Sequence, residues 1–388
     1  MSKASGEITG NIGEFSEPYV VARLLVDGEV PIINRHGEET GSSISIRGIR
    51  RSDCDKSVYI QRSDDSYQCE VNEEKQPPQS FSELRVLADA LLVEITSIKQ
   101  ERHRMKSRLT FVCPSASPLL AKLSFSVLKA RALEKSDLEI EIFDSLSLSG
   151  TRRAGFTIKS MLGSAPSLVN AGATIFKYEV SAEGDAINDL YARGVSGKEL
   201  VKELVSLPEF HYNYCEVSSD VFAENLRMID SLFEQILAAA LFYSYQVPGG
   251  HFEKIIKVIR FVDELAEICN QPENVCFFKH KMKEFLKQSA LGMQPSKAWD
   301  GTNEVTGGAL IVRDDGKVVC LCTDRDSDFR DYLYDSSRFE TPKSGEGDER
   351  LCTLHKGKDG KYFIKLSLQI RFKKPRSNSS RSMKPKQV

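Results

Sequence analysis

The spacing of apolar and polar residues predicts strands in some regions of the chain and helices in others. Alternation typical of strands occupies 43–70, 109–112, a hairpin with an Asp-Gly turn at 307–323 and one long strand at 360–372. Helical spacing begins near Ser16 to Pro18 and recurs over 80–105, 115–130 and 183–290. The mixture predicts a fold of the α+β or α/β class.

Changes in this spacing divide the chain into expected parts. We expect a core of strands and helices over 1–182, an all-helical subdomain over 183–295, a β-rich segment over 296–372 and a flexible tail over 373–388. The tail has no acid and carries six cations, Lys373, Lys374, Arg376, Arg381, Lys384 and Lys386. Such a tail either binds phosphate backbones without sequence preference or only aids solubility.

The composition of the chain limits the classes of protein to which it can belong. The chain has 388 residues, of which 40% are apolar, so it is long and apolar enough to form hydrophobic cores. Its net charge is −2. No apolar run approaches the ~20 residues that span a bilayer, and the start lacks the apolar middle of a secretory signal. We therefore expect a cytoplasmic protein without membrane contact. Nine scattered cysteines predict free thiols, with Cys320 and Cys322 packing rather than holding zinc.

A pair of strands over 137–159 carries the candidate chemistry. Opposite its apolar residues, the first strand presents an acidic face formed by Asp137, Glu139 and Glu141. The equivalent face of the second strand carries Thr157 and Lys159. If the two apolar faces lie on the same side of the sheet, Lys159 meets a row of carboxylates. An ordinary solvated strand face explains a single lysine equally well.

Carboxylates beside a lysine suit the hydrolysis of phosphodiesters. Carboxylate oxygens hold Mg2+, which polarises the scissile phosphate and acidifies a water, while a lysine stabilises negative charge. The order of Asp137, a turn and then Thr157-Ile-Lys159 is typical of the PD-(D/E)xK nucleases, so Asp137, Thr157 and Lys159 are the expected catalytic residues. Thr157 stands where the second carboxylate usually lies. That charge is expected from the facing strand or from the first helix, which leaves four candidates, Glu139, Glu141, Glu14 and Glu17.

Several ordered segments together resemble the HpaII-type restriction endonucleases, at 10–28, 136–144, 155–174, 281–301, 306–319 and 366–372. The resemblance implies a PD-(D/E)xK core with a mixed sheet. It also implies a type II, Mg2+-dependent, site-specific endonuclease of the bacterial cytoplasm, acting on double-stranded DNA as a homodimer within a restriction-modification system. The leading site is CCGG. Neither ATP nor a methyl donor is expected, in keeping with the absence of a GxxxxGK[ST] phosphate loop. The family usually has serine in place of Thr157 and tryptophan in place of Phe15.

Candidate DNA-binding residues come from two regions of the resemblance. Those near the C-terminus lie in a polar loop and in the final strand, namely Thr341, Lys343, Ser344, Gln369 and Arg371. Those near the hairpin are Ser160, Ser164 and Asn170, which contact the DNA backbone or only cap turns.

Two other functions remain as alternatives to a restriction endonuclease. They are a PD-(D/E)xK nuclease with little sequence preference and a DNA-binding protein that has lost catalysis. A helical scaffold protein is a further alternative, but it would leave the predicted strands unexplained.

Overall fold

The computed structural model describes residues 8–53, 56–102, 110–130, 136–143, 150–259, 274–341 and 351–373. A ten-stranded sheet in the order β2-β15-β14-β10-β9-β3-β4-β5-β6, with β7 against β5, is its largest element. The strands are β2 (Glu29–Ile33), β3 (Glu39–Ser52), β4 (Ser57–Arg62), β5 (Ser66–Val71), β6 (Glu74–Lys75), β7 (Gln79–Ser80), β9 (Leu138–Phe143), β10 (Thr151–Ser160), β14 (Gly308–Val312) and β15 (Val318–Cys322). The sheet is mixed, because β10 runs parallel to β14 and β15 parallel to β2 while the other pairs are antiparallel.

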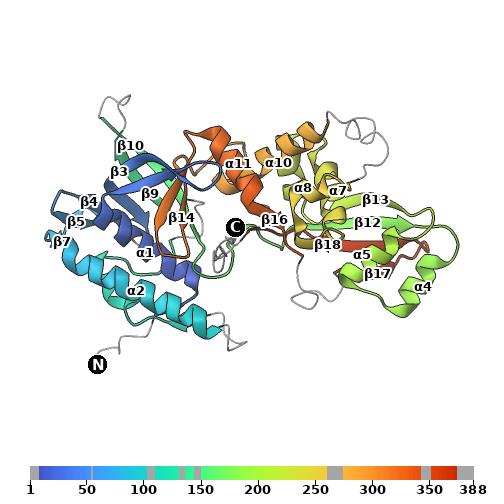
Figure 1. Cartoon of the computed structure of the whole chain (residues 1–388), viewed down its shortest axis with the longest axis horizontal. Coiled ribbons are helices and arrows are strands. Elements are labelled where there is room, and N and C mark those ends of the chain that lie inside the picture. Colours follow the sequence, from blue (N-terminus) through green and yellow to red (C-terminus); the bar gives the residue numbers. More distant parts are fainter. Residues whose placement is uncertain are drawn as a thin grey trace, which may run out of the picture.

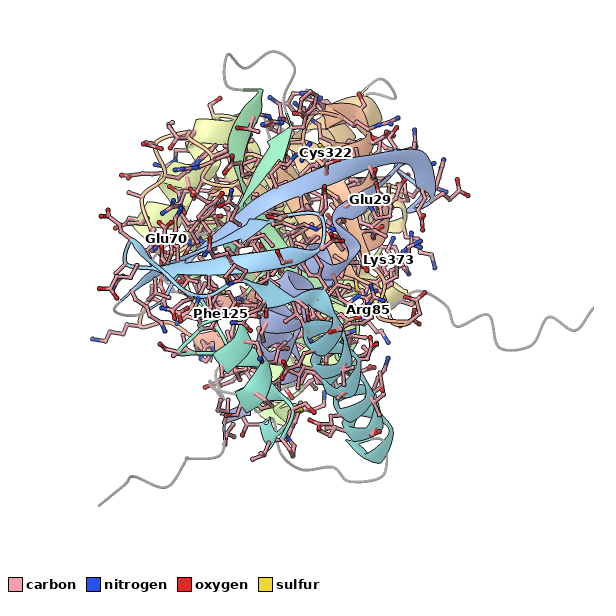
Figure 2. The ribbon with its side chains drawn as sticks, turned by 90° about the vertical axis from the view of Figure 1, so that its left-hand side faces the viewer. Glu29, Glu70, Arg85, Phe125, Cys322 and Lys373 are labelled. Carbon is pink, nitrogen blue, oxygen red and sulfur yellow. The ribbon has the colours of Figure 1, made fainter. Side chains whose placement is uncertain are left out.

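Three helices pack with this sheet, α1 (Ile12–Asp27), α2 (Phe81–Arg102) and α3 (Ala116–Lys122). Helix α1 contacts α2, α3 and β10. Figure 2 shows the blue strands in front, with α2, which carries Arg85, below them. Cys320 and Cys322 pack into the core shared by these helices and the sheet, as expected. A short pair of strands, β1 (Thr9–Gly10) and β8 (Phe111–Val112), precedes α1 and α3 respectively.

The start of α1 differs from the prediction. The helix begins at Ile12 rather than near Ser16 to Pro18, and Pro18 lies inside it. The cause is a capping box, in which the Glu14 amide donates to the Asn11 side chain (3.1 Å) and the Asn11 amide donates to the Glu14 carboxylate (2.9 Å). These two bonds fix the first turn of a helix that reaches the ten-stranded sheet. The helix ends at Gly28, which has a φ of 75°.

The region expected to be all helical contains a strand, so that prediction is wrong. Strand β13 (His211–Val217) pairs with β12 (Ile175–Ser181) in a four-stranded sheet completed by β18 (Tyr362–Ser367) and β17 (Leu354–Lys356). The aromatic Tyr212 stacks on Phe242, and this burial favours a strand in a sequence whose flanks are helical. The helices of this region are α4 (Ala186–Arg193), α5 (Gly197–Val205), α6 (Asp220–Ile229), α7 (Phe233–Ser244), η1 (Pro248–Gly250), α8 (Phe252–Ile255) and α10 (Asn274–Leu291).

The final strand is also not continuous. Strand β18 ends at Ser367, and β19 (Ile370–Phe372) begins in another sheet, where it lies between β11 (Ser167–Val169) and β16 (Ser337–Phe339). A helix, α11 (Asp326–Ser336), interrupts the segment expected to be β-rich. Figure 1 shows α10, α11 and β16 between the part that holds the ten-stranded sheet and the part that holds the four-stranded sheet. The basic tail beyond Lys373 lies outside the described residues.

Candidate functional site

A cleft of about 1060 Å³ brings together residues that are far apart in the sequence. It is lined by the start of α1, the end of β10, residues 163–173, the end of α10 with the loop to residue 296, and one residue of β19. Nine of the expected site residues line it, namely Glu14, Glu17, Asp137, Thr157, Lys159, Ser160, Ser164, Asn170 and Arg371. The cleft is therefore the candidate functional site.

Asp137 is held at one end of the hairpin by hydrogen bonds from the partner strand. Its amide donates to the Phe156 carbonyl (2.9 Å), and its Oδ2 accepts from the Ile158 amide (2.5 Å) and from Thr157 Oγ1 (3.0 Å). Both carboxylate contacts fall on Oδ2, which leaves Oδ1 for another partner. Thr157 is buried, and its hydroxyl orients Asp137 by donating this hydrogen bond.

Glu17 reaches the same cleft from α1. Its side chain is 7% exposed, and its Oε2 accepts a hydrogen bond from the Ala130 amide (2.9 Å). Burial raises the pKa of Glu17 to about 8, and the negative charge of Asp137 acts in the same direction. The two carboxylates therefore lie close enough to repel each other.

Lys159 is the cation beside these acids. It is half-buried in β10, next to Ile311 of β14. Burial lowers the pKa of Lys159, whereas the nearby charges of Asp137 and Glu17 favour its protonated form. The cleft thus places one lysine against two carboxylates that come from different elements.

The other acids expected at the site have different roles. Glu14 lines the cleft, but its Oε2 accepts the hydrogen bond from Asn11 that caps α1. Glu139 and Glu141 do not line the cleft. The register pairs Glu139 with Gly155 and Glu141 with Arg153, and Glu141 accepts a hydrogen bond from the Tyr59 hydroxyl (2.9 Å). The prediction that Lys159 faces a row of carboxylates is wrong, because Lys159 extends past the start of β9.

The expected DNA-binding residues are only partly brought together. Ser160 accepts a hydrogen bond from Ser16 (2.8 Å), and its Oγ also accepts from the Leu162 amide. Gln369 and Thr341 do not line the cleft, and Gln369 pairs through its carbonyl with the amide of Glu340. Lys343 and Ser344 lie outside the described residues.

Lys129 lines the cleft but gave no sequence signal, because it lies within apolar spacing typical of a helix. The structure ends the helix at Lys122 and fixes the following segment through a buried ion pair between Arg51 and Asp53 (3.2 Å). Asp53 accepts from the Ser126 amide (2.6 Å), and Arg51 Nη2 donates to the carbonyl of residue 127 (2.8 Å). These contacts hold Lys129 where its charge acts on both Glu17 and Lys159.

The donor set fits a hard divalent cation. In Asp137 and in Glu17 one carboxylate oxygen is held by a backbone amide, and burial, followed by the charge of Asp137, raises the pKa of Glu17, so a nearby cation would favour its charged form. Among the described residues no group of three or more histidines, cysteines, aspartates or glutamates is arranged to hold a metal. A cation would thus take two protein carboxylates and complete its coordination with other oxygens.

The cleft thus brings two acids and a lysine together at the end of strand β10 of the mixed sheet, a combination of groups suited to phosphodiester hydrolysis. A model of the HpaII restriction endonuclease family matches residues 11–372, and the chain belongs to this family of enzymes that act on DNA. The Type II restriction enzyme HpaII of Haemophilus parainfluenzae is 33% identical over 372 residues, which cover 94% of this chain and 98% of that protein. No solved structure matches the chain. Within its described parts, no helix is long and apolar enough to cross a membrane.

Proposed function

We propose that this chain is a Mg2+-dependent, site-specific endonuclease that hydrolyses both strands of double-stranded DNA at a short palindrome. CCGG is the first sequence to test, because the relative that matches over nearly the whole chain is a type II restriction enzyme. The convergence of Asp137, Glu17 and Lys159 in one cleft is the observation that carries the proposal. The β9–β10 hairpin would then be the catalytic part of a PD-(D/E)xK core.

Each residue of the site has a role on this proposal. Asp137 and Glu17 would hold the ion, and Thr157 keeps Asp137 oriented through its hydrogen bond to the carboxylate. When bound, Mg2+ polarises the scissile phosphate and acidifies a water. Lys159 orients that water or stabilises the negative charge that develops on the phosphate. Glu17 must lose its proton before it binds the ion, so metal affinity should rise with pH up to about 8.

The remaining partners follow from the same cleft. Ser160, Ser164, Asn170 and Arg371 would contact DNA, because they line the cleft beside the acids. A palindrome has two equivalent strands, so a homodimer with one cleft for each strand is the expected assembly. We expect the enzyme to work in the bacterial cytoplasm beside a DNA methyltransferase, and to need neither ATP nor a methyl donor itself.

Digestion of a plasmid of known sequence tests the function. With Mg2+ the purified protein should give discrete fragments, their sequenced ends should share one short palindrome, and EDTA should stop the reaction. A smear would instead indicate a nuclease with little sequence preference. Binding of duplex DNA without any metal-dependent nicking would indicate that the protein has lost catalysis.

A further inference from the structure

One wall of the cleft is built by elements that carry none of the acids. Helix α10 contacts β11, and β11 pairs with β19, so that Ser167 lies opposite Arg371. Ser289, near the end of α10, lines the cleft together with Ser167 and Arg371. These residues come from three separate parts of the sequence and meet on this wall.

Ser289 has a buried hydroxyl without a partner. Ser289 is 2% exposed, and its Oγ makes no hydrogen bond to any residue that the structure describes. A buried serine in a helix ordinarily donates to a carbonyl of the preceding turn. Ser16 does so to Ile12 (2.7 Å), and Ser244 does so to Leu241 (2.6 Å). Because an unpaired buried hydroxyl destabilises the free protein, Ser289 is a donor without an acceptor in that state.

Arg371 likewise has a buried N–H donor without an acceptor among the described residues, here in a charged group. Its Nε is buried and has no hydrogen-bond partner within the described part of the chain, although its side chain lines the cleft. Among the described residues no ion pair involves Arg371, whereas Arg338, opposite it in β16, pairs with Glu340 (2.7 Å). A guanidinium carries five N–H donors and accepts none, so this group also requires an acceptor.

On the proposed function, in which DNA occupies this cleft, we infer that Ser289 and Arg371 form one donor site for acceptor atoms of the bound duplex. A buried neutral hydroxyl and a half-buried guanidinium whose Nε is buried, on the same wall, suit a phosphate oxygen or the acceptor edge of a base. Bound DNA supplies the acceptors that the protein lacks. Ser289, which no sequence pattern marked, thereby becomes a binding residue of the α10 wall.

The test replaces Ser289 and measures both stability and binding. Ser289→Ala removes the hydroxyl, and Ser289→Cys removes it while keeping the volume. Because the hydroxyl has no partner in the free protein, the melting temperature of both variants should stay the same or rise. Binding of a fluorescent duplex that carries the site read from the fragment ends, with divalent metal withheld, should weaken about three- to tenfold, as for one lost hydrogen bond.

Ser337→Ala is the matched control. Ser337 is fully buried and its Oγ also has no partner among the residues that the structure describes, but it does not line the cleft. Its replacement should leave DNA binding unchanged. A scrambled duplex of the same length distinguishes the two kinds of acceptor. Equal weakening on both duplexes by the Ser289 variants assigns the hydroxyl to a phosphate, and weakening on the cognate duplex alone assigns it to a base.

Three results would overturn the inference. Unchanged binding by both Ser289 variants in a wild-type protein that cuts DNA would sink it and leave the proposed function standing. A loss of binding that follows a loss of melting temperature would reassign Ser289 to a structural role. If the wild-type protein neither cuts nor binds duplex DNA, the proposed function fails and the donor site falls with it.

Discussion

Replacing Glu17 by glutamine tests the electrostatics of the cleft without its substrate. The pKa of Glu17 is raised from 4.5 to about 8, chiefly by burial and then by the charge of Asp137. Between these two pH values the folded protein holds a proton that the unfolded chain releases. The folded state is therefore fully stabilised below pH 4.5 and loses stability as the pH rises to about 8. The shift corresponds to at most about 5 kcal/mol, at about 1.4 kcal/mol for each pKa unit.

The assay is denaturant unfolding at several pH values from 5 to 9, with EDTA present. Glutamine resembles the protonated acid, so Glu17→Gln should match the wild type at pH 5 and exceed its free energy of unfolding increasingly towards pH 9. Glu14→Gln, a control on the same helix and at the same cleft, leaves Glu17 in place and should keep the wild-type pH dependence.

Magnesium gives the same experiment a second arm. An ion bound by Glu17 and Asp137 favours the charged carboxylates, so excess Mg2+ should reduce the loss of wild-type stability at high pH. The Glu17→Gln variant should gain less from the ion. A difference between variant and wild type that stays constant from pH 5 to 9 would show that Glu17 is not held in its protonated form, and would refute the reasoning.

Three further predictions concern cleavage. Asp137→Ala and Lys159→Ala should each reduce the rate on the order of a hundredfold or more with DNA binding retained, and more than a few per cent of activity in a gel assay would remove the hairpin from catalysis. Thr157→Val should slow cleavage at saturating DNA about three- to tenfold, because Asp137 loses one of its two donors, while Thr157→Ser should recover most of the rate. Lys129→Ala should slow cleavage about tenfold, because a charged hydrogen bond to phosphate is lost. Lys122→Ala, the control, breaks an ion pair with Glu83 (2.7 Å) and should leave the rate unchanged. Equal cleavage rates for the two variants would exclude a contact between Lys129 and the phosphate.

The strands of the hairpin could be predicted from sequence, but their register could not. Alternation fixes which side chains share a face, and a shift of the pairing by two residues keeps every side chain on its face. By alternation alone, Asp137, Glu139 and Glu141 are equivalent, and only the order of the motif pointed to Asp137. The pairing of Phe156 with Leu138 makes Asp137 the neighbour of Thr157. Glu139 and Glu141, which were also candidates, lie outside the cleft because of the same pairing.

The start of α1 and the strand β13 show two ways in which a local rule was outweighed. Proline is favoured in the first turn of a helix, which placed the predicted start near Pro18, yet the paired hydrogen bonds of Asn11 and Glu14 extend the helix by more than a turn before it. In β13, Tyr212 gains burial against Phe242, which comes from a distant helix. The capping residues were readable in the sequence, whereas the aromatic contact was not.

Several polar groups of the cleft share one property that sequence patterns cannot reveal. They are buried without enough hydrogen-bond or charge partners. Burial favours the neutral forms of Glu17 and Lys159, and the hydroxyl of Ser289 and the Nε of Arg371 are buried without acceptors. A bound cation would compensate the acids, and a phosphodiester would offer acceptors to the donors. Each binding event would thus remove part of the penalty that the free cleft carries. Since a metal between the acids also attracts phosphate, Mg2+ and DNA should bind more tightly together than separately.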